Sequence, residues 1–220
     1  MLTLADELVL LAYDDDGTCR LGKPSLGYGL AGAVLVELAI AGRVDVVDKR
    51  VAALSTVPIG HPVLDAALTT IADDRLRKPK EWVEKLAKGL PDDVLDGLAD
   101  QEVLRREQDK VLWVFPRTRF PSPGGVEPPV ETEVRRRLAA AIGTDGPVDA
   151  RTAALCSIIR AVQFDRTVFA AQPRDRVKKR LKEISDGGWA ADATRKAVEE
   201  VQAALTAVMV AVIIPSTMTG

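Results

Sequence analysis

Residues 27–44 read GYGLAGAVLVELAIAGRV, and this stretch decides the fold. From Tyr28 to Ala41 it contains no proline and is apolar nearly all round, which predicts a helix at the centre of a domain. Small residues between Gly29 and Ala33 would let neighbouring helices approach closely. Gly42 is the expected left-handed terminator of this helix. The alternation that follows predicts a short hairpin of residues 43–47 and 51–54.

Helical periodicity also dominates the rest of the chain. A first helix is predicted at residues 3–13, where Thr3 and Asp6 have capping-box spacing. Further helices are predicted at residues 61–72, 79–88, 94–99, 130–142, 148–169, 173–185 and 191–214. After 94–99, a polar turn at 107–109 is expected to join strands at 103–106 and 111–115.

Residues 116–129 hold five prolines and two glycines, which predicts a surface loop without a regular element. No long linker of low complexity divides the chain elsewhere. We therefore expect one mainly α domain spanning residues 1–220, with small β-hairpins.

Composition excludes several functions. The 220 residues carry 30 Lys and Arg against 32 Asp and Glu, a net charge of -2 and a pI of about 5.6. A global attraction to nucleic acid is therefore absent, so we expect no nucleic-acid partner. The helix-then-hairpin pattern also occurs in DNA-binding winged helices, but no clear basic recognition helix accompanies it.

The cellular location is also suggested by the sequence. Cys19 and Cys156 belong to no motif, which favours a reducing compartment. Asp6 and Glu7 interrupt the apolar N-terminus, so no export signal is expected. The longest apolar run, residues 203–214, is too short to cross a bilayer, which takes about 20 residues. These features predict a cytoplasmic protein.

No catalytic, metal or cofactor site is visible. His61, the single histidine, precedes Pro62 at a helix start and is expected to be a surface cap. Cys156 lies in an apolar run, which is typical of a buried, inert thiol. No glycine-rich phosphate loop follows a predicted strand.

Two basic clusters and one apolar strand remain as candidate contact surfaces. Arg135 to Arg137 form the first cluster, and residues 174–182 form the second, with six cations against Asp175. Each is either a solvated helix face or a local attraction for phosphate groups. Residues 112–115 are four large apolar residues in succession, so one face of the strand is either covered by a helix or contacts a partner or membrane.

Several segments together resemble the Golgi phosphoprotein 3 family over nearly the whole chain. The opening one is Leu2-Thr3-Leu4-x-Asp6-Glu7-x-Val9-Leu10-Leu11, and the second is Gly29-Leu30-x-Gly32-x-x-Leu35-x-Glu37-Leu38-Ala39-x-x-Gly42-Arg43-Val44. Others are Val63-Leu64-Asp65-x-Ala67-Leu68, the helix and hairpin of residues 98–115, Arg151-x-x-Ala154-Leu155 and the closing apolar helix.

The resemblance implies a helical, non-enzymatic protein without a cofactor, peripheral on the inner face of a membrane. Its expected partners are a membrane surface and the head group of phosphatidylinositol 4-phosphate or another anionic phospholipid. A protein partner or a second copy of the chain is also possible. Asparagine is absent, as in proteins from GC-rich genes. The resemblance therefore also suggests a bacterial, actinobacterial member.

The family's head-group pocket is altered here. In relatives, the pocket consists of a tryptophan before the second helix, an arginine within that helix and two arginines ahead of the hairpin. The corresponding residues in this chain are Gly22, Ala31, Lys88 and Pro91. One of the four keeps a positive charge, and a lysine supplies a point charge instead of a bidentate fork. Lys23, beside Gly22, is a second candidate, so Lys23 and Lys88 are the predicted head-group residues.

The family's exposed apolar hairpin corresponds to residues 111–115. Leu112, Trp113, Val114 and Phe115 are therefore the predicted membrane or partner contact. Two hypotheses follow. The protein docks on a membrane through an anionic head group, with the hairpin adding apolar contact. Alternatively, it is a protein-protein adaptor of the same fold that has lost head-group binding and uses the hairpin and the loop of residues 116–129 to hold partners or copies of itself.

Overall fold

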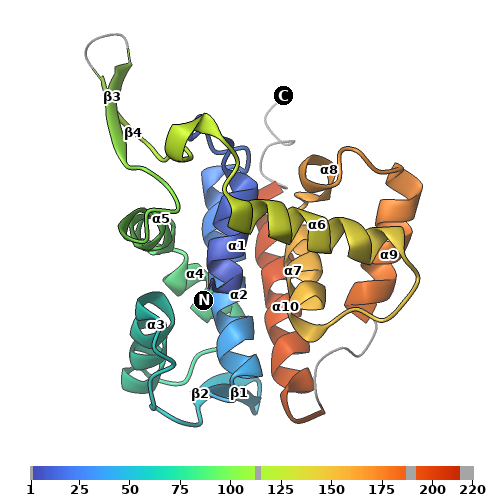
Figure 1. The fold of residues 1–220 in the computed structure, drawn as a ribbon. Coiled ribbons are helices and arrows are strands. Elements are labelled where there is room, and N and C mark those ends of the chain that lie inside the picture. Colours follow the sequence, from blue (N-terminus) through green and yellow to red (C-terminus); the bar gives the residue numbers. More distant parts are fainter. Residues whose placement is uncertain (1, 112–114, 187–191, 214–220) are drawn as a thin grey trace, which may run out of the picture.

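A computed structural model describes residues 2–111, 115–186 and 192–213, and the helix predicted from the opening stretch lies at its centre (Figure 1). This helix, α2 (Lys23–Ile40), contacts α1 (Leu4–Ala12), α4 (Pro79–Leu86), α7 (Ala150–Ala161) and α10 (Asp192–Ile213). It begins at Lys23 rather than Tyr28, because Pro24 is tolerated in the first turn of a helix. Its side chains are buried on every side from Leu30 to Val36.

The small residues of α2 allow its neighbours to pack closely. A Cβ placed on Gly29 would lie 2.9 Å from the Cδ2 atom of Leu8 in α1. A Cβ on Gly32 would lie 2.9 Å from Cδ2 of Leu205 in α10. Both distances are shorter than normal van der Waals contact, so a side chain at either glycine would displace the leucine that packs against it. The predicted small side of α2 is therefore the side that two other helices use.

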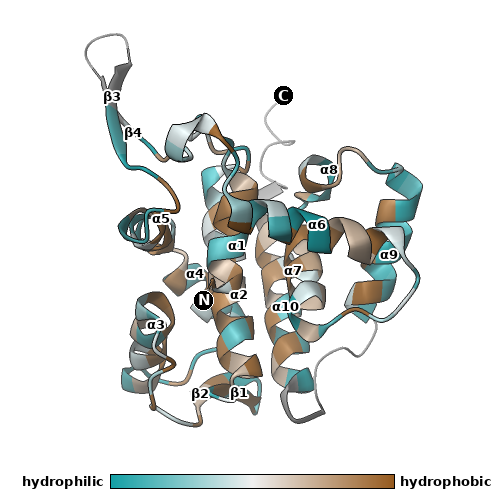
Figure 2. Cartoon of the chain, viewed as in Figure 1, coloured by the Kyte–Doolittle hydropathy of each residue, from teal (hydrophilic) through white to brown (hydrophobic). Residues whose placement is uncertain are grey.

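The remaining elements flank this centre. On one side lie α3 (Pro62–Asp73), α4, α5 (Leu90–Asp100) and the antiparallel pair β1 (Val44–Val47) and β2 (Arg50–Ala53), in which Val44 faces Ala53. On the other side lie α6 (Pro129–Gly143), α7, α8 (Asp165–Val168) and α9 (Arg174–Asp186). Hydrophobic faces of these helices point toward α2 and α10 (Figure 2). The prediction of a mainly α, single helical domain with small hairpins is confirmed.

The second hairpin differs from the prediction. Its strands are β3 (Glu107–Val111) and β4 (Phe115–Arg119), paired from Glu107 with Arg119 to Val111 with Phe115. The predicted turn at 107–109 and the predicted strand at 103–106 are therefore wrong. The backbone N–H groups of Val103 and Leu104 bond instead to the Leu98 carbonyl at the end of α5.

Part of the predicted loop at 116–129 is also regular. Pro116 lies within β4, which is possible because both strands of a two-stranded ribbon are edges. A short 3₁₀ helix, η1 (Pro123–Gly125), follows, and α6 begins at Pro129. In Figure 1, β3 and β4 project away from the helices.

The helix predicted over residues 148–169 is broken into two. Gln163 has a φ of 58°, in the left-handed region, and separates α7 from α8. The Phe164 N–H bonds to the Ile159 carbonyl and the Gln163 N–H to the Arg160 carbonyl, which closes the end of α7. Phe164 is buried beyond the break. Because glutamine is not a typical helix terminator, the apolar pattern predicted one continuous helix here.

Candidate functional site

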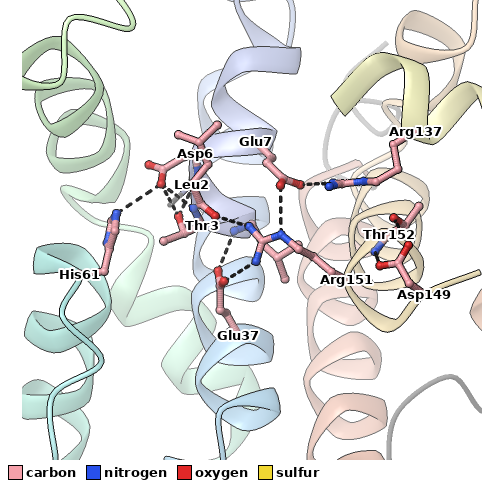
Figure 3. A network of polar contacts seen from close by, with 11 residues as sticks. Leu2, Thr3, Asp6, Glu7, Glu37, His61, Arg137, Asp149, Arg151 and Thr152 are labelled. Carbon is pink, nitrogen blue, oxygen red and sulfur yellow. Dashed lines mark hydrogen bonds and ion pairs between the residues drawn. The ribbon is translucent and has the colours of Figure 1, made fainter. Parts of the chain in front are cut away.

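A network of buried charges joins four helices beside the start of α1 (Figure 3). Arg151 in α7 donates from Nε to Glu7 Oε1 at 3.0 Å and from Nη1 to Glu37 Oε1 at 2.6 Å. It also donates to the backbone carbonyl of Leu2. Burial alone would lower the pKa of Arg151, but the Glu7 and Glu37 carboxylates raise it above its ordinary value. One guanidinium therefore ties α1, α2 and α7 together.

The two carboxylates have further donors. Glu7 accepts a hydrogen bond at 2.6 Å from Arg137 in α6, and Glu37 accepts one at 2.6 Å from the backbone N–H of Leu4. Glu7 is 4% exposed, so its charge depends on these arginines. Because both carboxylates are neutralised by fixed partners, the network serves to hold the helices rather than to transfer protons.

His61 adjoins this network and is not the surface cap that the sequence predicted. Its side chain makes no capping hydrogen bond to α3. Its Nε2 atom lies 3.3 Å from Asp6 Oδ2, and the side chain is 17% exposed. Asp6 in turn accepts hydrogen bonds from the Thr3 backbone and hydroxyl. His61 therefore packs α3 against the capping box of α1.

The predicted head-group residues are brought to one region. Lys23 is the first residue of α2, directly after its N-cap Gly22, and both are exposed. A Cβ placed on Gly27, one turn further along, would lie 3.0 Å from the carbonyl oxygen of Ala87. Ala87 precedes Lys88 in the turn between α4 and α5. The start of α2 thus packs against the turn that carries Lys88.

Other family pocket positions differ in exposure. Ala31 is fully buried, because it lies one helical turn beyond Gly27 on the same face of α2. Pro91 is partly exposed in the first turn of α5. Within the described part of the chain, the ammonium groups of Lys23 and Lys88 have no hydrogen bond or ion pair. Two unpaired lysines are what the region offers to an anion.

A cavity of about 800 Å³ lies between α3, α4 and α5, and Lys88 lines it. Gly22, Lys23, Ala31 and Pro91 do not. Its charged lining consists of Lys85 and Lys88 against three aspartates, and its apolar lining includes Leu86 and Leu90. The aspartates are Asp93, Asp96 and Asp100. This surplus of carboxylates makes the cavity unlike an anion pocket, although Asp96 is paired with Arg106 at 2.6 Å.

The predicted contact hairpin is only partly described. Leu112, Trp113 and Val114 lie outside the described residues, and Phe115 is the first residue of β4. The described strands lie beyond the helices (Figure 1) and are hydrophilic along most of β3 (Figure 2). No helix among the described residues is both long enough and apolar enough to span a membrane.

Comparison with known proteins agrees with this arrangement. The sequence model of the family Golgi phosphoprotein 3 (GPP34) matches residues 4–201 of the chain. The chain belongs to the Golgi phosphoprotein 3 family. Vacuolar protein sorting-associated protein 74 of Eremothecium gossypii is 26% identical over 139 residues, which are 52% of this chain and 42% of that protein. The chain thus spans less than half the length of this relative.

The family resemblance rests partly on the buried charges. Asp6, Glu7, Glu37 and Arg151 all lie in the segments that resemble the Golgi phosphoprotein 3 family. The fold joins Glu7, Glu37 and Arg151 in one network and places Asp6 beside it, in contact with His61. Sequence reasoning did not place these residues together. Glu37 could have indicated this network, because a carboxylate within an apolar stretch of a buried helix needs a buried partner.

Several arginines of the two basic clusters bond to groups of the protein itself, so they are not free surface charges. Each arginine of the first cluster is paired within the protein: Arg135 with Glu131, Arg136 with Glu133 and Arg137 with Glu7. In the second cluster, Arg176 donates to the carbonyls of Ile142 and Gly143, and Arg180 to that of Ala141. These two arginines therefore satisfy the last carbonyls of α6.

Proposed function

We propose that this protein is a non-enzymatic peripheral membrane adaptor that binds the head group of an anionic phospholipid such as phosphatidylinositol 4-phosphate. The binding surface would be the start of α2 and the α4–α5 turn. The observation that carries the proposal is the pair of unpaired lysines, Lys23 and Lys88, on two segments in contact. Membership of the Golgi phosphoprotein 3 family supports it.

The local geometry favours an anion at this place. Gly22 offers no side chain to cap α2, so the backbone N–H groups of Lys23 and Ser25 lack a side-chain cap and can face a ligand, whereas Pro24 between them has no N–H. The positive end of the helix dipole adds to the charge of Lys23. Two lysines hold a phosphate less selectively than arginine forks. We therefore expect salt-sensitive binding with modest preference among anionic lipids.

The projecting hairpin provides the second contact in this proposal. A single weak membrane signal gives marginal attachment, whereas two together give stable attachment. β3 and β4 extend beyond the helical body (Figure 1), and the apolar residues 112–114 follow β3 in the sequence. We infer that these residues enter the interfacial layer of the membrane while the lysines contact head groups.

Vesicle co-sedimentation tests the proposal. The vesicles would contain phosphatidylcholine alone, with phosphatidylinositol 4-phosphate, or with phosphatidylserine at equal charge. We expect binding to both anionic compositions at low salt. Lys23→Ala/Lys88→Ala should weaken it about tenfold or more, since each basic residue near an anionic surface contributes about 1 kcal/mol.

The matched control is Lys182→Ala/Lys196→Ala, which removes two exposed lysines away from this region. It should retain most of the binding. The proposal fails if no anionic vesicle binds the protein at low salt, or if the two double variants lose binding equally.

The protein-protein adaptor is the second candidate, and the cavity beside Lys88 favours it. Three aspartates on one wall and an apolar floor are unsuited to a phosphate but suited to a protein surface. Under this alternative, Lys23→Ala/Lys88→Ala leaves partner binding intact. Trp113→Ala weakens association with a partner or with a second copy, as sedimentation velocity would show.

A further inference from the structure

A second, smaller hollow lies between α8 and α9, away from the lysines of the proposed head-group surface. Its volume is about 150 Å³. Three of its lining residues are cationic, namely Arg166 from α8 with Arg174 and Lys178 from α9, and Asp165 is the one acidic group that lines it. Buried Phe169 and Val177 form its apolar part and belong to the core of the protein.

The three cations have no partner within the described part of the chain. No hydrogen bond or ion pair of Arg166, Arg174 or Lys178 side chains is present there. The same helix shows the contrast, because Arg176 and Arg180 are held by carbonyl oxygens at the end of α6. Arg174 and Lys178 are four residues apart and therefore share one face of α9. Like charges at this spacing repel each other without a counter-ion.

Size and chemistry together suit a single phosphate group. Ligand cavities for larger organic molecules are typically about 300–1,000 Å³, so this hollow fits a smaller group. Arginine guanidinium groups bind phosphate oxygens through two parallel N–H donors, and a lysine adds a point charge. The donors also come from two separate helices, so they can contact one anion from two directions.

The position of the hollow indicates where the phosphate would come from. α8 and the beginning of α9 lie toward the same end of the molecule as the beginning of α2 and the projecting hairpin (Figure 1). A membrane that contacts the hairpin and Lys23 would therefore also face the end of the molecule where this hollow lies. We propose that the α8–α9 hollow binds the phosphate of a second anionic phospholipid in that membrane.

This inference rests on the proposed function for the source of its ligand, and it adds a second attachment point. Once one head group is bound, the second binding event occurs within the same complex at a high effective concentration. Attachment should therefore be stronger than either point alone provides. It should also fix the orientation of the protein on the surface.

The first test uses inorganic phosphate with the full-length chain. Amide NMR spectra would be recorded during titration with phosphate, against chloride at equal ionic strength. We expect saturable shifts within residues 165–178. Arg174→Ala/Lys178→Ala should abolish them, whereas Lys179→Ala/Lys182→Ala, which removes the same charge from the same helix, should keep them. Absent shifts, or equal loss in both variants, would overturn the phosphate site.

The second test measures vesicle affinity for the same variants. Arg174→Ala/Lys178→Ala should bind anionic vesicles about tenfold more weakly than Lys179→Ala/Lys182→Ala, with an unchanged melting temperature because all four side chains are exposed. Equal affinities of these two variants would overturn the inference. In that case, a loss confined to Lys23→Ala/Lys88→Ala leaves the proposed function standing.

The two tests also separate the lipid from free phosphate as the ligand. Phosphate shifts in the hollow without any vesicle binding by the wild-type chain would overturn both the proposed function and the lipid assignment. Phosphate shifts together with a selective loss of vesicle binding are the combination that supports the inference.

Discussion

Arg151 in α7 and Glu37 in α2 form an ion pair of 2.6 Å, at a distance of 114 residues along the chain. Glu37 stands in a part of α2 that is otherwise apolar from Leu30 to Ile40, and Arg151 also holds Glu7 of α1. The pair therefore sets how three helices meet. Its partners come from the segments that resemble the Golgi phosphoprotein 3 family, so the likeness reflects the construction of the fold.

Removing Arg151 should destabilise the protein strongly. Arg151→Ala leaves Glu7 without one of its arginines and Glu37 without its cation, at a cost of about 3–5 kcal/mol in the free energy of unfolding. Arg136→Ala is the control, because its ion pair with Glu133 is exposed to solvent and contributes little to stability. Urea unfolding of both variants measures the difference. Similar losses in the two would contradict a role for the network in stability.

Stability should depend on pH through Glu131. Burial raises the pKa of this carboxyl from 4.5 to about 7, against the effect of Arg135. The folded state therefore binds more protons than the unfolded state between these values. The stabilisation is complete below pH 4.5 and is lost as the pH rises through 7.

Glu131→Gln should flatten this dependence, because the glutamine does not titrate. The measurement is the urea midpoint of both proteins at pH 5 and pH 8. Between pH 5 and pH 8, the urea midpoint of the wild-type protein should fall further than that of the variant. An equal or smaller fall would contradict the raised pKa of Glu131.

Two glycines within helices should respond in opposite directions to alanine. Gly97 in α5 has nothing within 4 Å of an added Cβ, so Gly97→Ala should stabilise the protein by about 0.5–1 kcal/mol. A Cβ on Gly29 meets Leu8 at 2.9 Å and Val162 at 3.1 Å, so Gly29→Ala should cost about 1–3 kcal/mol. Thermal denaturation compares the two variants. A stabilised Gly29→Ala would show that α1 and α7 adjust freely.

The two cysteines should differ in reactivity. Burial raises the pKa of the Cys156 thiol to about 12, and its side chain is fully buried. Cys19 is half-buried, and burial raises its pKa as well. At pH 8, iodoacetamide should therefore label Cys19 slowly and Cys156 only after unfolding. Peptide mass spectrometry locates the label, and labelling of native Cys156 would reveal opening of the core.

The sequence predicted structure correctly where neighbouring residues within one helix or hairpin determine it. The unbroken apolar stretch in α2, the close packing of its glycines and the hairpin of β1 and β2 follow from neighbouring residues. The predictions failed where a distant contact or an unusual backbone decides the outcome. Gln163 ends α7 in a left-handed conformation, and Pro116 enters β4 because that strand is an edge.

Part of the candidate site could be named from the sequence, and part could not. Lys88 was named from its position in the family pattern and Lys23 because it adjoins Gly22, and the structure places their segments in contact. The ion pair of Arg137 with Glu7 and the hydrogen bonds of Arg176 and Arg180 to α6 could not be predicted, because their partners lie on other helices. Which cations stay free for an anion is thus a tertiary property.

By itself, the sequence determined the helical class, the central helix and the family of this protein, because helical periodicity and glycine spacing act over a few residues. The tertiary structure alone decided which charges neutralise each other and which remain unpaired. Electrostatic pairing depends on distances of a few ångströms between segments far apart in the chain, and only folding sets those distances.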